Sequence, residues 1–148
     1  MKIRLAEKQD VGALVEFNLS MAFETEGKRL SADVLRPGVE AVFEDKYKGF
    51  YVVADDNGLI VGGLLVTFEW SDWRNKWFWW IQSVYIRPEY RGRSIYRQMY
   101  DYVRELAESN GDIAGFRLYV ERENENARKV YEKLGMLESH YLLYEEEK

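Results

Sequence analysis

The sequence predicts an α/β fold, organised as one domain over residues 1–148. Strand-like and helix-like patterns alternate along the chain, with no low-complexity linker between them. Residues 56–58 (Asp-Asn-Gly) separate two apolar runs, and an Asn-Gly step adopts the positive φ angles of a tight hairpin turn. A further run, 76–86, is apolar on both faces, which is typical of a strand in the centre of a sheet.

Composition narrows the class of protein. The chain has no cysteine and one histidine, so disulfides, thiol nucleophiles and thiolate metal sites are excluded and no metal site is expected. The net charge of −5 argues against nucleic acid as the main partner and mildly favours a cationic substrate. No run reaches the roughly 18 apolar residues of a membrane helix. We therefore expect a cytoplasmic protein with no membrane partner.

The N-terminal elements follow from spacing and capping residues. A short strand is predicted over 2–6, and helical spacing of apolar residues from Val11 onward predicts a helix with Asp10 as its N-cap. Ser31 is the expected cap of a second helix. Pro37 should interrupt that helix, because proline lacks the amide hydrogen that a helix interior needs.

Three strands are expected next. The hairpin strands cover 50–54 and 59 to about 68, as antiparallel neighbours. In the central strand, simple alternation places one set of side chains on each face. The two sets are Phe78, Trp80, Val84 and Ile86 on one face, and Trp77, Trp79, Ile81 and Tyr85 on the other.

The C-terminal part predicts a helix, a strand, a second helix and a last strand. The long helix begins near Ile95 and ends at the Asn-Gly step 110–111. A strand over 116–120 should lie parallel to the central one. Gly135 should end the last helix in the C′ position, and residues 136–144 should close the sheet as a strand.

Two motifs carry a resemblance to a known family. The first covers 84–92 (Val-Tyr-Ile-Arg-Pro-Glu-Tyr-Arg-Gly), and the second covers 124–136, which is similar to a family segment ending in Tyr-x-x-x-Gly-Phe. With these two motifs in this order, and with the predicted order of strands and helices, the chain resembles the GNAT superfamily of acyl-CoA-dependent N-acetyltransferases over essentially its whole length. The resemblance implies a mixed, mostly antiparallel sheet with a splayed parallel strand pair and about four flanking helices. The hairpin also resembles the diamine N-acetyltransferase branch.

The resemblance implies acetyl-CoA as the cofactor. Backbone groups of Val84, Tyr85 and Ile86 would pair with the pantetheine arm like a further strand, and an amide there would polarise the thioester carbonyl. The diphosphate would lie at the start of the long helix, where amide hydrogens converge and arginine adds charge. The residues concerned are Arg91, Gly92, Arg93, Ser94, Ile95 and Tyr96. The chain departs from the family pattern here, because Ser94 and Tyr96 replace small residues.

The resemblance also assigns catalytic candidates. Tyr131 matches the family tyrosine that protonates the departing thiolate, and core packing is its alternative role. Asn124 would help to bind the cofactor, or would simply cap the last helix. The diamine-like branch has a glutamate at the position of Gln82, whose amide can orient a water but cannot accept the proton of the incoming ammonium. Glu69 is the nearest acidic candidate, and Glu24 or Glu26 could contribute from the segment after the first helix, with a solvated surface charge as the alternative for each.

The predicted function is transfer of an acetyl group from acetyl-CoA to a primary amine of a small molecule or protein, by direct attack. Five tryptophans crowd one hairpin, which favours core packing or a homodimer, with contact to an amine substrate as the alternative. Ser94, Tyr96 and Gln82 together motivate a second hypothesis. In it, the chain is a catalytically degenerate GNAT-fold module that binds a ligand or acts as a dimeric regulator.

Overall fold

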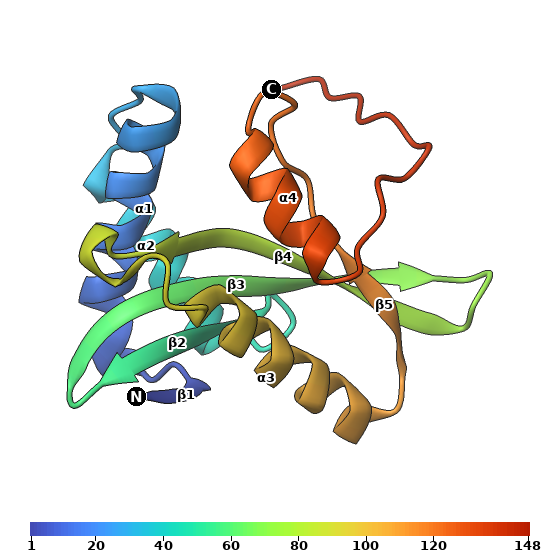
Figure 1. The fold of residues 1–148 in the computed structure, drawn as a ribbon, viewed down its shortest axis with the longest axis horizontal. Coiled ribbons are helices and arrows are strands. Elements are labelled where there is room, and N and C mark those ends of the chain that lie inside the picture. The colour runs from blue at the N-terminus through green and yellow to red at the C-terminus, as the bar shows by residue number, and fades with distance from the viewer. The chain divides into compact units, whose positions relative to one another are not determined.

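A computed structural model describes residues 1–148 (Figure 1). The chain forms two compact units, Met1–Leu118 and Tyr119–Lys148, and each is described by itself. The expected single domain over 1–148 therefore stays a prediction. No helix is both long and apolar enough to cross a membrane.

The first unit is built on one five-stranded sheet in the order β1-β2-β3-β4-β5. Its strands are β1 (Lys2–Leu5), β2 (Phe50–Asp56), β3 (Leu59–Ser71), β4 (Lys76–Ile86) and β5 (Ile113–Arg117). Neighbouring strands are antiparallel, except that β4 and β5 are parallel. The helices are α1 (Val11–Glu26), α2 (Ala32–Glu44) and α3 (Ile95–Asn110), and the second unit adds α4 (Glu125–Lys133). The mostly antiparallel sheet with a parallel pair and four helices is confirmed.

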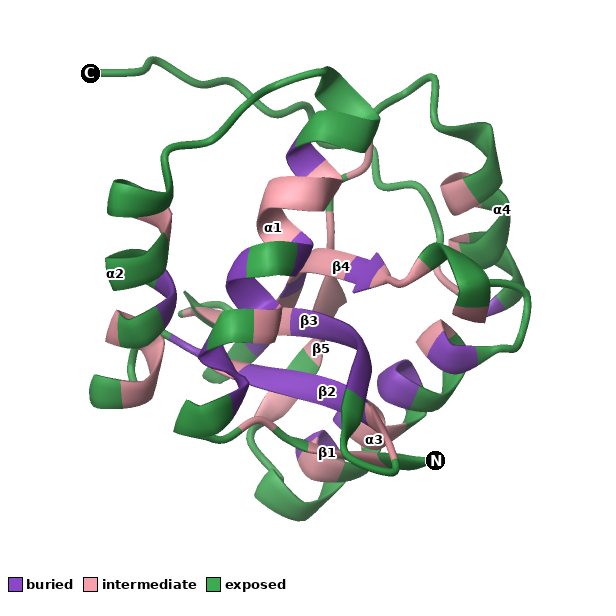
Figure 2. Cartoon of the chain, turned by 90° about the vertical axis from the view of Figure 1, so that its left-hand side faces the viewer, coloured by how far each residue is buried: buried purple, intermediate pink, exposed green.

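Two adjacent glycines of β3 show that α1 and α3 cover opposite faces of the sheet. A Cβ on Gly63 would meet Leu14 and Phe17 of α1, whereas a Cβ on Gly62 would meet Ile95 of α3. Because successive residues of a strand point to opposite faces, the two helices lie on different sides. Figure 2 shows β2 and β3 largely buried between these helices.

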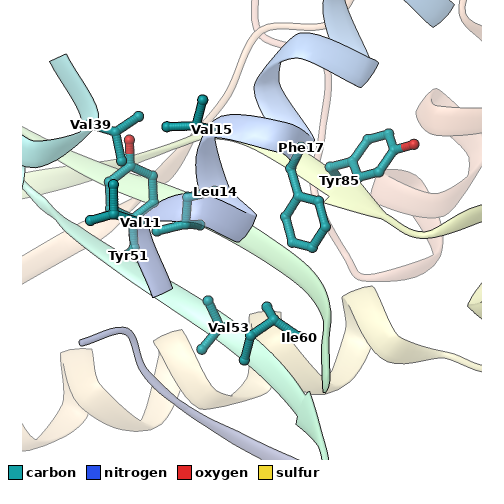
Figure 3. Close-up of a cluster of buried hydrophobic side chains, with 9 residues drawn as sticks. All are labelled: Val11, Leu14, Val15, Phe17, Val39, Tyr51, Val53, Ile60 and Tyr85. Atoms are coloured by element: carbon teal, nitrogen blue, oxygen red, sulfur yellow. The ribbon is translucent and has the colours of Figure 1, made fainter. Parts of the chain in front are cut away.

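The core on the α1 face explains why the helix takes its place. Leu14 and Phe17 are each 2 % exposed, and they pack with Val39 of α2 and with Tyr51 and Tyr85 of the sheet (Figure 3). The Phe17 and Tyr85 rings lie 5.3 Å apart. Burial of such side chains contributes roughly 1.5–3 kcal/mol each, more than helix propensity supplies.

Two capping residues take their predicted positions but make no cap bond. Asp10 is the N-cap residue of α1, but its side chain makes no bond to that helix. It is buried instead, accepts hydrogen bonds from both terminal nitrogens of Arg4 at 2.8 and 3.1 Å, and accepts another from the Glu7 amide. Ser31 is the N-cap residue of α2 but its side chain makes no cap bond either. Pro37 does not interrupt the helix, since α2 continues through it to Glu44. Val39, two residues further along, is held in the core.

Two strand expectations are also corrected. The strand expected at 116–120 is β5, Ile113–Arg117, which lies earlier because residues 113–117 are the ones that pair with Trp77–Trp80 of β4. Residues 136–144 form no strand. The Ser139 hydroxyl accepts a hydrogen bond from the Tyr141 amide, and such a local turn competes with strand pairing. The expected end of α4 is confirmed, since Gly135 has φ = 92° and its amide and that of Met136 bond back to the last turn.

Candidate functional site

The site begins with an edge of β4 that no strand covers. The parallel strand β5 pairs with β4 only from Trp77 to Trp80, and β4 then continues to Ile86. From Ile81 to Ile86 one edge of β4 therefore has no strand neighbour, while β3 pairs with the other edge. Backbone N–H and C=O groups on such an edge are available to an extended ligand.

A β-bulge lies inside this open stretch. Gln82 pairs with Leu65 and Tyr85 pairs with Gly63, so two residues of β4, Ser83 and Val84, oppose a single residue of β3. Ser83 has φ = 52°, a left-handed conformation that non-glycine residues rarely adopt. The bulge takes the amides of this segment out of the regular ladder, as bulges beside functional sites commonly do.

The bulge corrects the predicted faces of β4. Simple alternation placed Tyr85 with Ile81 and Trp79, but the extra residue reverses the alternation beyond Gln82. Tyr85 therefore lies on the α1 face, beside Phe17, together with Gln82 and Trp80. Ile86 lies on the α3 face.

The loop after β4 delivers an uncapped helix N-terminus. Gly92 and Ser94 both have left-handed backbones, with φ angles of 79° and 59°, and residues 91–94 are exposed. The first amide that donates along α3 is that of Gln98, to the Ser94 carbonyl, and the Ser94 side chain makes no cap bond. The amides at the start of α3 therefore lack helical partners, which suits an anion such as a diphosphate.

Tyr96 leaves this end of the helix open. Its ring lies 6.1 Å from the ring of Tyr100, one turn further along α3, and Tyr100 in turn packs against Phe116 of β5. Because residues 91–94 remain exposed, the large side chain at position 96 does not cover the loop. The residues present therefore fit a diphosphate at this place.

The two expected arginines of the loop have different surroundings. Arg91 donates through Nε to the Ile86 carbonyl at 2.9 Å and through a terminal nitrogen to Glu24 at 3.2 Å. Its guanidinium also lies 5.3 Å from the centre of the Tyr85 ring. Arg93 is exposed and lies over the Tyr90 ring. Arg93 is thus the freer of the two to meet an anion.

Polar side chains line the α1 face of β3 and β4 beside the bulge. The Gln82 amide donates to the Thr67 hydroxyl, and the Trp80 indole donates to Glu69 at 2.9 Å. Arg117 of β5 donates to the same oxygen of Glu69 at 2.8 Å. The hydrogen bonds from Trp80 and Arg117 hold the pKa of Glu69 below its usual value, and the bond from Trp80 contributes most. Glu69 is therefore a fixed negative charge and a weak proton acceptor.

The remaining candidates belong to the second unit. The Asn124 side chain accepts a hydrogen bond from the Ala127 amide at 3.2 Å and so caps α4. Capping was one of the two roles predicted for this residue. Tyr131 is half-buried on α4, and burial raises the pKa of its hydroxyl above the usual value of 10.0. A tyrosine in this state keeps its proton at neutral pH.

Sequence reasoning missed two participants in this arrangement and gave a third another role. Ser83 creates the bulge and Thr67 receives the amide of Gln82, whereas Glu24, a candidate base from the sequence, holds Arg91. No glycine or proline marks the bulge in the sequence. Glu24 lies far from the loop along the chain, and only its place four residues after Ser20 on one helix face hints at a common role.

Most of the chain matches the model of one protein family. The family model described as Acetyltransferase (GNAT) family matches residues 15–136. The chain belongs to the GNAT acetyltransferase family. GNAT acetyltransferases use acetyl-CoA, so the cofactor expected from the sequence is that of the family. The comparison with curated proteins gives no match.

Solved structures agree with the GNAT fold. A possible acetyltransferase from Clostridium difficile 630 is 44% identical, with a TM-score of 0.93, over 99% of this chain and 97% of that one. A predicted acetyltransferase with acetyl-CoA from Clostridium acetobutylicum is 20% identical, with a TM-score of 0.80, over 98% and 95% of the two chains. A ribosomal-protein-alanine N-acetyltransferase from Brucella melitensis biovar Abortus 2308 is 18% identical, with a TM-score of 0.77, over both whole chains. The last two likenesses concern the fold alone.

Proposed function

We propose that this GNAT protein transfers the acetyl group of acetyl-CoA to a primary amine of a small molecule or protein, by direct attack of the amine on the thioester. The observation that carries the proposal is the open edge of β4, from Ile81 to Ile86, which leads into the uncapped N-terminus of α3. An extended arm and an anionic group joined end to end would match this pair of features. Bound acetyl-CoA supplies the activated acetyl group.

The open edge binds and orients the acetyl donor. Backbone groups of Val84, Tyr85 and Ile86 would hold the pantetheine arm as a further strand would be held. A backbone amide of this segment would donate to the thioester oxygen, where a fixed N–H dipole would stabilise the negative charge that develops. Such a donor typically contributes about 3 kcal/mol to lowering the barrier.

The α3 end binds the diphosphate. The amides of Gly92, Ser94, Ile95 and Tyr96 supply hydrogen bonds, and the positive end of the helix dipole adds to them. Arg93 adds a full charge from an exposed position. Asn124 is proposed to support this site by fixing the start of α4 through its cap bond.

Tyr131 is proposed as the proton donor to the departing thiolate. Burial raises its pKa, so the hydroxyl carries its proton throughout the neutral range. The protonated hydroxyl would supply the proton that the departing thiolate takes up to become the free thiol.

On the α1 face of β3 and β4, neither Glu69 nor Gln82 is suited to take the proton of the incoming ammonium. Glu69 has a lowered pKa, and Gln82 has no basic atom. We propose that Gln82, fixed by its bond to Thr67, orients a water that carries this proton away, and that Glu69 attracts the cationic amine. The resemblance to the diamine branch and the homodimer both stay predictions.

Calorimetry with acetyl-CoA is the first test, followed by a panel of amines with release of the free thiol as the readout. We expect binding of acetyl-CoA and thiol release with at least one primary amine. If millimolar acetyl-CoA gives no binding heat, the proposal fails and a non-catalytic module with the GNAT fold is the better description. Binding without turnover for any amine or protein acceptor would likewise favour the ligand-binding module.

A further inference from the structure

One face of α1 carries three polar residues that contact the end of β4 or the segment after it. Glu16, Ser20 and Glu24 follow one another at intervals of four residues, which places them in one row along the helix. Ser20 donates a hydrogen bond to the Tyr85 hydroxyl, and that hydroxyl donates to Glu24. The row is therefore tied to the end of β4.

Two arginines from the loop reach the same row. Arg87 donates to the Ile60 carbonyl at 2.9 Å and to Glu16 at 3.1 Å, and its guanidinium lies over the Phe17 ring. Arg91 repeats the pattern, with the Ile86 carbonyl, Glu24 and the Tyr85 ring as its partners. Each arginine thus joins a backbone carbonyl of the sheet, an aromatic ring and a glutamate of α1.

The loop between these arginines and α3 needs such support. It contains left-handed residues at Gly92 and Ser94, and the non-glycine one is in a costly conformation of order 1 kcal/mol or more. The amides that it must present lie at the start of α3, which covers the opposite face of the sheet from α1. The Arg91 guanidinium is engaged by Glu24 of α1 and by the Ile86 carbonyl.

We propose that Glu16 and Glu24 of α1 are positioning residues for the cofactor loop: through Arg87 and Arg91 they fix the backbone that receives the diphosphate, and Arg91 acts through this backbone without touching the phosphate. The inference rests on the proposed acetyl-CoA site. It deepens that proposal by assigning Arg91 a role other than the direct charge contact that the family resemblance implied.

The two roles of Arg91 predict opposite effects of removing Glu24. If Arg91 bound the diphosphate, Glu24 would compete for the guanidinium, and Glu24→Ala would tighten CoA binding. If Arg91 is a brace, Glu24→Ala loosens the loop and weakens CoA binding. The matched control is Glu26→Ala, because Glu26 lies at the end of the same helix and pairs only with the exposed Lys28.

The experiment measures the Kd of CoA by calorimetry for the wild type and for Glu24→Ala, Arg91→Gln, the double variant and Glu26→Ala. We expect Kd to rise about fivefold in Glu24→Ala, the factor set by a half-exposed ion pair. Arg91→Gln should give a similar or larger rise, and the double variant should be no worse than Arg91→Gln. Glu26→Ala should leave Kd unchanged. A lower Kd in Glu24→Ala, or additive losses in the double variant, would overturn the inference.

A charge exchange and a salt titration complete the test. Glu24→Arg combined with Arg91→Glu should recover part of the affinity that either change loses alone, because the pair is restored with its polarity reversed. A glutamate at position 91 could not recover affinity if that side chain faced the phosphate. The salt dependence of Kd should fall in Arg93→Gln and stay unchanged in Arg91→Gln. Absence of CoA binding by the wild type would instead refute the proposed function.

Discussion

Gly62 of β3 is the position where a single added methyl group should disturb the cofactor site most directly. A Cβ at this residue would lie 2.9 Å from the end of the Ile86 side chain, 3.2 Å from the Tyr85 carbonyl oxygen and 3.6 Å from Ile95. Ile86 ends β4 and Ile95 begins α3. The Gly62→Ala change therefore pushes against the tip of β4, while its contact with Ile95 at the start of α3 is an ordinary one.

The size of the effect follows from two opposing contributions. Overpacking of a filled core costs about 1–3 kcal/mol. Replacing glycine restricts the unfolded chain and gives back about 0.4–1 kcal/mol. The free energy of unfolding of Gly62→Ala should thus fall by about 1 kcal/mol. The matched control is Gly38→Ala in α2, where nothing lies within 4 Å of the added Cβ, and which should stabilise the protein by up to about 1 kcal/mol.

Urea unfolding followed by tryptophan fluorescence measures both variants, and calorimetry measures their Kd for CoA. We expect Gly62→Ala to unfold at a lower urea concentration than the wild type and to bind CoA more weakly, whereas Gly38→Ala unfolds later and binds CoA normally. If Gly62→Ala were as stable as Gly38→Ala and bound CoA like the wild type, the close packing of β3 against Ile86 and Ile95 would be refuted.

Four further predictions follow from the site and the fold. Tyr131→Phe should lower kcat about 100-fold with little change in the Kd of CoA, and full kcat in the variant would remove this residue from the mechanism. Because burial raises the pKa of Tyr131, the fall in wild-type kcat that marks loss of the acid should be centred above pH 10. Gln82→Glu should raise turnover of a primary amine about tenfold or more by supplying a base, measured by thiol release, and an unchanged rate would show that proton removal does not limit turnover. Asp10→Ala should lower the unfolding free energy by about 3 kcal/mol, because Arg4 loses its buried partner, with Glu108→Ala as the exposed control. Hydrogen bonds from the Gly58 amide and then from Arg4 lower the pKa of Asp55. Its contribution to the free energy of unfolding is therefore complete above the unfolded pKa of 3.8 and is lost as the pH falls through the lower folded pKa. In Asp55→Asn this part of the pH dependence of the unfolding free energy should be absent.

Local signals in the sequence were sufficient where one residue type determines the backbone. Asn57 and Gly58 have the positive φ angles that their hairpin turn requires, and Gly111 and Gly135 end α3 and α4 in left-handed conformations, as predicted. The same reasoning failed where packing overrides local preference. Pro37 remains inside α2 because its neighbours hold the helix against the core.

The site was predictable as a sequence segment but not as an arrangement of side chains. The strand, turn and helix at residues 84–96 could be assigned to cofactor binding from their motif. The bulge at Ser83 could not, since serine carries no preference for a left-handed backbone, and this one extra residue moved Tyr85 to the opposite face of the sheet. The engagement of Arg91 by Glu24 depends on how α1 packs on the sheet, a long-range contact that no local pattern encodes.

The bulge at Ser83 also bears on whether foreign strands can add to the open edge of β4. An unpaired strand border is a template on which foreign polypeptide can grow, and from Ile81 to Ile86 this chain leaves one uncovered. A continuous peptide needs a flat, evenly spaced row of donors and acceptors, and the irregularity in the middle breaks that row. The same distortion that suits a short thioester arm thereby discourages cross-β stacking.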